Sequence, residues 1–226
     1  MSAPRRIWVT RTRPQADATA ASLRAMGLEA VVEPVLAVRT LAEVVVDPSG
    51  ADAIAFTSGH AVRAFARLCA NRDLPVFTVG AATAGLARSL GFETVHSADG
   101  DVAALARLIA DAKPRPTLVL NPTALEPVAD LGALLTVQGL KVRRVAVYET
   151  VEAPVSPALA DITAVLIHSP KAGRAVAALI SADQARRLSA YAISEAAAAP
   201  LRALPFASVF VAPFPTEAAL LNLLQG

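Results

Sequence analysis

The feature that most constrains the fold of this chain is an internal repeat of strands and helices. Short apolar runs rich in β-branched residues alternate with segments of helical periodicity along the 226 residues. The opening segment, Ile7 to Val38, matches Leu118 to Tyr148, and Ser58 in one half matches Ser169 in the other. Alternating strands and helices predict an α/β protein, with two related domains that are each built on a parallel sheet.

Two valine-rich stretches are predicted to link these domains. Each is read as one long strand, and each follows a helix-like segment that ends at a glycine, Gly27 or Gly139. We interpret residues 31–39 and 143–151 as the two linker strands. Tyr148, near the end of the second, is then expected beside the cleft that the linker strands leave.

The linker strands imply that one domain is discontinuous. Residues 40–146 are predicted to form an inserted middle domain, and residues 1–36 together with 151–226 to form an end-built domain. A hydrophobic content of 54% supplies enough apolar residues for two cores.

Composition excludes several classes of function. A net charge of +2 without a dense basic stripe argues against a general nucleic-acid-binding protein. The single cysteine, Cys69, excludes a disulfide framework, and the three histidines lack the spacing of metal ligands. The apolar run after the basic N-terminus is too short for a signal peptide, and none is long enough for a bilayer. We therefore expect a cytoplasmic protein that neither binds membranes nor holds a metal through thiols or spaced histidines, and we take it to be a monomer.

Candidate binding positions lie where strands lead into helices. In parallel sheets, ligands bind beyond the carboxyl ends of the strands, where helix N-termini offer unpaired N–H groups and partial positive charge. For any single Ser or Thr there, plain helix capping is the favoured interpretation. Together, these positions can hold a ligand with several carboxylates. They are Thr10 to Pro14, Ser58-Gly59, Gly80 to Thr83, Asn121 to Thr123, Ser169-Pro170, Ser194 and Pro215-Thr216.

Familiar catalytic motifs are absent from the sequence. It contains no Walker loop, no dinucleotide-binding G-x-G-x-x-G and no G-x-S-x-G elbow. His168 precedes Ser169, but adjacent residues of a strand point to opposite faces, which argues against a nucleophile and its base. Tyr148 has two interpretations, a strand-packing residue with a solvated hydroxyl or a member of a site.

The order and spacing of several short motifs resemble the uroporphyrinogen-III synthase family over nearly the whole chain. The motifs are Val9-Thr10-Arg11, Glu33-Pro34-Val35-Leu36, the run from Phe56 to Val62, Val79 to Ala84, Val147-Tyr148-Glu149-Thr150, and His168-Ser169-Pro170 before Ala172-Gly173. Each is weakly specific alone, and their joint order carries the resemblance.

The resemblance implies an enzyme of tetrapyrrole synthesis, with two α/β domains joined by two strands and with no cofactor. Its substrate would be hydroxymethylbilane, a linear chain of pyrroles with acetate and propionate groups. Loss of the hydroxyl would leave an azafulvene, and a spiro intermediate would then reclose with the last ring inverted to give uroporphyrinogen III. Transient contact with hydroxymethylbilane synthase is a further implied partnership.

The resemblance also assigns roles to individual residues. Tyr148 matches the family's tyrosine and would hydrogen-bond or protonate the leaving hydroxyl. Carboxylates would be held by helix-end amides and by residues matching cleft positions, with Lys171 near enough to help. These substrate-binding candidates are Arg11, Ser58, Gly59, Gly80, Thr83, Ser169, Lys171 and Ser194.

One turn departs from the family pattern. Many members have a Gly-Pro-Thr-Thr type turn where this chain has Ser194-Glu195-Ala196-Ala197. Ser194 is the candidate replacement for the lost threonine hydroxyls, and Glu195 is expected to cap its own helix. The altered turn keeps an alternative open, a catalytically inactive ligand-binding or regulatory protein of the same fold.

Overall fold

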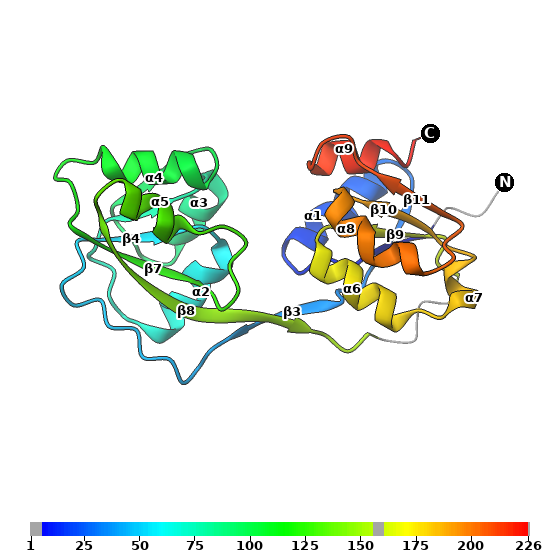
Figure 1. The fold of residues 1–226 in the computed structure, drawn as a ribbon, viewed down its shortest axis with the longest axis horizontal. Helices are drawn as coiled ribbons and strands as arrows, with labels where there is room; N and C mark the ends of the chain where they lie inside the picture. The colour runs from blue at the N-terminus through cyan, green and yellow to red at the C-terminus, as the bar shows by residue number, and fades with distance from the viewer. Residues whose placement is uncertain (1–5, 156–160, 226) are drawn as a thin grey trace. The chain divides into compact units, whose positions relative to one another are not determined.

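The computed structural model describes residues 6–155 and 161–225 as two compact units. The discontinuous unit comprises Met1–Ala37 and Val151–Gly226, and the middle unit comprises Val38–Thr150. Strands β3 (Leu36–Thr40) and β8 (Lys141–Glu152) each contain one boundary between the units (Figure 1). Both units are built on parallel-dominated sheets, which confirms the predicted α/β class.

The sheet of the discontinuous unit has five parallel strands in the order β11-β10-β9-β1-β2. The strands are β1 (Arg6–Val9), β2 (Glu29–Val32), β9 (Ala164–Ile167), β10 (Ser189–Ala192) and β11 (Ser208–Val211). Alternate side chains face opposite sides, so Trp8 packs in one core cluster while Ile7 and Val9 pack in the other. Both faces are therefore buried, as continuous apolar strands require.

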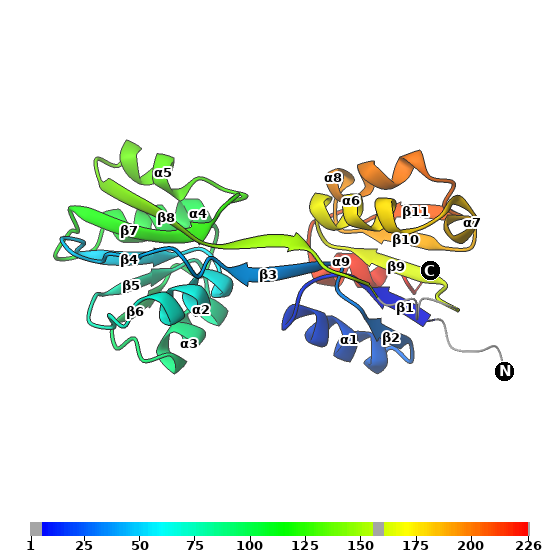
Figure 2. The same ribbon diagram turned by 90° about the horizontal axis from the view of Figure 1, so that it is seen from below.

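Helices cover both faces of this sheet (Figure 2). One face packs against α1 (Gln15–Ala25) and α9 (Glu217–Asn222). The other packs against α6, α7, α8 and the 3₁₀ helix η1, whose bounds are Pro170–Leu179, Ala182–Ala185, Glu195–Ala198 and Ala199–Ala203. This arrangement puts the N-termini of α1, α6, α8 and α9 after the carboxyl ends of β1, β9, β10 and β11.

The sheet of the middle unit has the order β3-β8-β7-β4-β5-β6, in which β8, β7, β4, β5 and β6 run parallel. The further strands are β4 (Ala53–Phe56), β5 (Val76–Thr78), β6 (Val95–Ser97) and β7 (Leu118–Ala124). Helices α2 (Gly59–Leu68) and α3 (Ala81–Ser89) cover one face, and α4 (Val102–Ala110) and α5 (Leu131–Val137) cover the other (Figure 2). No helix in the described ranges is long and apolar enough to cross a membrane.

The first valine-rich stretch is two strands, which corrects the prediction of one. Strand β2 pairs with β1, whereas β3 neighbours β8 in the other sheet. Pro34 lies between them and has no N–H for a ladder, so the chain leaves one sheet there and enters the other. The second stretch forms one continuous strand, β8, as expected.

A second correction concerns the predicted turn at Asn121 to Thr123, which belongs to strand β7. Pro122 pairs in register with Val145 of β8. The Asn121 side chain donates from Nδ2 to the carbonyl of Ala55 at 2.9 Å, and this hydrogen bond connects β7 to β4. Val128 precedes α5 and is fully exposed, because Asp130 caps that helix.

Candidate functional site

Tyr148 lies at the carboxyl end of the middle unit's sheet. It is the residue of β8 paired with Ala124, the last residue of β7. The side chain is 8% exposed and packs in the core cluster that lies under α2 and α3. Its carbonyl accepts from the amide of Leu125 at 2.8 Å. The hydroxyl makes no hydrogen bond within the described ranges of the chain, so it can still donate to a ligand.

His60, which the sequence analysis did not assign to the site, lies beside Tyr148. The two ring centroids are 5.9 Å apart. Burial lowers the pKa of His60 below 6.5, and the nearby charge of Arg63 lowers it further. The imidazole is therefore neutral at neutral pH. Its position in the Ser58-Gly59-His60 sequence, at the start of a helix after a buried strand, was the available signal.

Ser58 and Gly59 join β4 to α2. The hydroxyl of Ser58 accepts from the amide of His60 at 3.1 Å, which makes Ser58 the N-cap of α2. A Cβ on Gly59 would lie 3.1 Å from Cδ2 of Leu86, so glycine allows α2 and α3 to approach closely. Ser58 therefore acts as a helix cap, which is the plain interpretation of a serine at this position.

The start of α3 differs, because no side chain caps it. Gly80 is the N-cap and has extended backbone. Ala81 and Ala82 follow it and are exposed, whereas Thr83 is buried at 9% exposure. The first amides of α3 thus have no side-chain cap, and uncapped helix N-termini are sites where anions bind.

Ser169, Lys171 and Ser194 lie at the carboxyl edge of the discontinuous unit's sheet. Ser169 caps α6 by accepting from the amide of Ala172 at 3.1 Å. Lys171 is in the first turn of the same helix. Ser194 caps α8 by accepting from the amide of Ala197 at 3.3 Å. Both serine hydroxyls are engaged in capping and retain the capacity to donate.

The turn that departs from the family pattern, Ser194 to Ala197, contains a helix cap and an ion-paired carboxylate. Ser194 caps α8, so the expectation that Glu195 caps its own helix is wrong. Instead, Oε1 of Glu195 accepts from Nε of Arg202 at 2.9 Å and from its Nη2. The new carboxylate is therefore neutralised by an arginine of η1.

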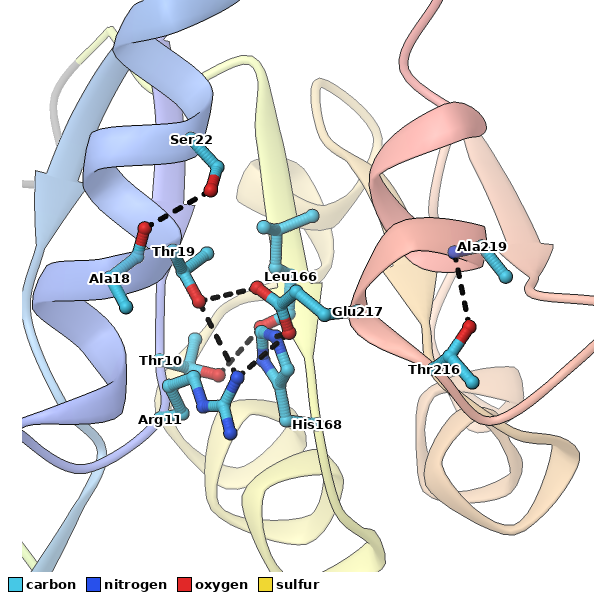
Figure 3. Close-up of polar contacts among 10 residues, drawn as sticks. All are labelled: Thr10, Arg11, Ala18, Thr19, Ser22, Leu166, His168, Thr216, Glu217 and Ala219. Carbon is cyan, nitrogen blue, oxygen red and sulfur yellow. Dashed lines mark hydrogen bonds and ion pairs between the residues drawn. The ribbon is translucent and has the colours of Figure 1, made fainter. Parts of the chain in front are cut away.

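Arg11 lies in a network of polar side chains that we call the Glu217 cluster, formed by Arg11, Thr19, His168 and Glu217 (Figure 3). Nη1 of Arg11 lies 2.7 Å from Oε2 of Glu217 and 3.4 Å from Oγ1 of Thr19. Thr19 donates to Oε1 of the same carboxylate. Thr10, next to Arg11, donates to the carbonyl of Leu166 at 2.6 Å and ties the end of β1 to β9.

His168 completes this cluster and is not paired with Ser169. Its Nε2 lies 3.1 Å from Oε2 of Glu217, and its side chain is 6% exposed. Because a carboxylate only accepts, Nε2 carries the proton. Nδ1 is buried and makes no hydrogen bond within the described residues. The rejected nucleophile-and-base pairing is absent from the described residues, since Nε2 of His168 contacts Glu217 and Nδ1 makes no hydrogen bond there.

Glu217 is ionised in this environment. Burial acts to raise the pKa of its carboxyl, but hydrogen bonds from His168 and Thr19 and the charges of His168 and Arg11 outweigh burial. The pKa falls from 4.5 to about 2. Glu217 follows Thr216, the N-cap of α9, and the local sequence there indicates only the start of this helix. No local sequence pattern pairs it with Arg11, because 206 positions separate them.

The nine candidate residues thus fall into two sets. Tyr148 and the residues at the starts of α2 and α3 lie at the carboxyl edge of one sheet, and Arg11, Ser169, Lys171 and Ser194 lie at that of the other. A cavity of about 400 Å³ lies elsewhere, at the amino ends of β4 and β7. None of the candidates lines it. Within the described ranges, no three His, Cys, Asp or Glu side chains come together as metal ligands do.

Comparison with known proteins identifies the family. The model of the family described as uroporphyrinogen-III synthase HemD matches residues 17–222. The uroporphyrinogen-III synthetase of Helicobacter pylori is similar in structure, with a TM-score of 0.69 and 18% identity over 99% of both chains. A mutant uroporphyrinogen III synthase of Thermus thermophilus gives a TM-score of 0.52 and 16% identity over 98% of both chains. No curated protein matches the sequence.

At these identities the two solved structures show the shared fold. The family model spans most of the chain, including Tyr148, Ser58, Thr83 and Ser169. On that match, this chain belongs to the uroporphyrinogen-III synthase family, whose members are cyclising enzymes of tetrapyrrole biosynthesis.

Proposed function

We propose that this family member converts hydroxymethylbilane to uroporphyrinogen III, with Tyr148 as the proton donor and with the substrate-binding candidates named above holding the substrate carboxylates. The observation that carries the proposal is the position of Tyr148. It lies on β8 opposite the last residue of β7, next to the start of α2, with a hydroxyl that has no partner within the described ranges.

In the proposed reaction, the Tyr148 hydroxyl donates to the leaving hydroxyl, which departs as water and leaves an azafulvene. The substituted carbon of the last pyrrole ring attacks it and forms the spiro intermediate. That intermediate opens and recloses with the last ring inverted, and the proton lost on ring closure returns to the Tyr148 phenolate. Because the substrate ionises readily, the protein's main tasks are orientation and protonation of the leaving group.

Carboxylate binding is assigned to two kinds of group. Charged donors come from Arg11 and Lys171, and hydroxyl donors from Ser58, Thr83, Ser169 and Ser194. Backbone amides at Gly59 and after Gly80 add partial positive charge at helix N-termini. The uncapped first turn of α3 supports this assignment most directly, because its amides have no side-chain competitor.

The proposal extends to the setting of the reaction. We assign the protein to the cytoplasm, as a monomer that contacts hydroxymethylbilane synthase transiently. The contact with the synthase is proposed on chemical grounds, because free hydroxymethylbilane cyclises spontaneously and a short transfer path limits that loss. Sedimentation of the purified protein, alone and mixed with that synthase, tests the monomeric state and the transient contact. A stable dimer of this chain would contradict the monomeric state.

The direct experiment supplies purified protein with enzymatically generated hydroxymethylbilane and resolves the product isomers. Formation of the type III isomer is expected. If only the spontaneous type I isomer accumulates while the protein is folded, the alternative of an inactive ligand-binding or regulatory protein replaces this proposal. The altered turn at Ser194 and Glu195 is the observation that keeps the alternative in view.

A further inference from the structure

Arg11 uses only part of its guanidinium group within the protein. Nη1 contacts Glu217 and Thr19. Nε and Nη2 make no hydrogen bond in the parts of the chain that the structure describes. Figure 3 shows Nη2 directed away from Glu217. The side chain is 28% exposed, so this second edge of the group is accessible.

Two other arginines of this protein bind carboxylates through the Nε/Nη2 edge. Arg39 donates from Nε at 2.9 Å and from Nη2 at 2.6 Å to Glu149. Arg202 donates from the same two nitrogens to Glu195. A planar guanidinium presents these donors in a fixed geometry that matches a carboxylate. In Arg11 this edge makes no hydrogen bond to any described residue.

Glu217 is itself rigidly supported. Its Oε1 accepts from Thr19 on α1, and its Oε2 contacts Arg11 after β1 and His168 after β9. Thr19 is 1% exposed, and the His168 side chain is 6% exposed. Because three donors from separate elements fix both carboxylate oxygens, Glu217 holds one orientation of the Arg11 group.

We propose that Glu217 is a positioning residue, which anchors Nη1 of Arg11 and so directs the Nε/Nη2 edge of that arginine to a carboxylate of the substrate. This inference rests on the proposed function, which assigns Arg11 to carboxylate binding. Glu217 does not touch the substrate. It accepts from Arg11 as an ionised carboxylate, so the anchor stays in place throughout the neutral range.

The experiment measures KM and kcat for type III formation in four proteins, wild type, Glu217→Gln, Arg11→Ala and the double variant. Glu217→Gln is expected to raise KM about tenfold, the effect of one hydrogen bond to a charged group, and to leave kcat nearly unchanged. Arg11→Ala is expected to raise KM at least as much. The double variant should match Arg11→Ala, because Glu217 acts only through Arg11.

Glu29→Gln is the matched control. Glu29, the first residue of β2, pairs at 2.8 Å with Arg6, the first residue of β1, in the same unit. The KM of the Glu29→Gln protein should equal that of wild type. If Glu217→Gln does not fold, Thr19→Val is the second variant. It removes the hydroxyl that donates to Glu217 without changing side-chain size, and it should also raise KM.

Two results separate the inference from the proposed function. If Arg11→Ala raises KM but Glu217→Gln leaves it unchanged, or if the two effects multiply in the double variant, positioning by Glu217 is overturned while Arg11 stays a binding residue. If Arg11→Ala leaves KM unchanged, the assignment of Arg11 fails and the inference fails with it. Thermal unfolding of each variant shows whether the comparison is made on folded protein.

Discussion

The imidazole ring of His60 lies 5.9 Å from the phenol ring of Tyr148, and the two planes are inclined by 49°. The two residues come from different elements, the first turn of α2 and strand β8. Burial and Arg63 keep the imidazole neutral at neutral pH by lowering its pKa. The proposed donor hydroxyl is therefore carried by a ring that packs against an uncharged neighbour.

Replacement of Tyr148 by phenylalanine tests the donor directly. Tyr148→Phe keeps the ring in its core contacts and removes only the hydroxyl, so kcat should fall about 100-fold, the lower part of the range for positioned acid–base groups. The melting temperature should barely change, because the hydroxyl has no partner within the described ranges. Tyr191→Phe, which alters the chain's other tyrosine, is the control and should retain type III formation. Near-normal activity of a folded Tyr148→Phe protein would leave orientation as the whole mechanism.

The ionisation of His60 can be followed by NMR titration of its ring protons. We expect its pKa below 6.5, with burial as the larger cause and Arg63 as the smaller. Arg63→Gln should raise this pKa and leave it below 6.5, because burial remains. A histidine whose pKa falls on folding destabilises the protein as the pH drops below the unfolded value. A pKa of His60 above 6.5 in the wild type would contradict this account.

Acid unfolding should report on Glu217. Its pKa is about 2 in the folded protein against 4.5 as the reference value, so it stabilises the fold above pH 4.5. That contribution is lost as the pH falls from 4.5 towards about 2. Because the side chain is 33% exposed, solvent screening limits the effect to about 1 kcal/mol.

Glu217→Gln should therefore lose less stability than the wild type across this pH range, measured by denaturant unfolding. Glu29→Gln, which alters an exposed carboxylate of the same unit, is the comparison. An identical acid dependence in wild type and Glu217→Gln would show that the carboxylate is not preferentially ionised by folding.

Two helical glycines should respond in opposite directions to alanine. A Cβ on Gly173 would run into the carbonyl oxygen of Ala197 and would lie 3.4 Å from Cγ of Pro200. Gly173→Ala should therefore destabilise the protein by about 1–3 kcal/mol, as overpacking does. Gly85 in α3 has open space around it, so Gly85→Ala should stabilise by about 0.5–1 kcal/mol. Equal unfolding midpoints for the two variants would contradict the close packing of α6 on α8.

Much of the fold was predictable because the signals are local. Capping residues marked helix starts such as Ser169 and Thr216, and the apolar run at Ser208–Val211 is strand β11. The predictions were wrong at two places where the extent of a strand depends on the neighbouring strand with which it pairs. Pro34 separates two strands that join different sheets, and Asn121 continues a strand by using its side chain. Local periodicity does not contain that information.

The sequence by itself determined the repeat, the α/β class and the family, because these depend on periodicity and on the order of short motifs. It also supplied the candidate residues at strand ends. Only the tertiary structure decided what each side chain contacts, such as His60 at Tyr148 and Arg202 at Glu195. The physical reason is that hydrogen bonds and ion pairs depend on distances of a few ångströms. Sheet order, which brings β1 beside β9, sets those distances between residues as far apart in sequence as Arg11 and Glu217.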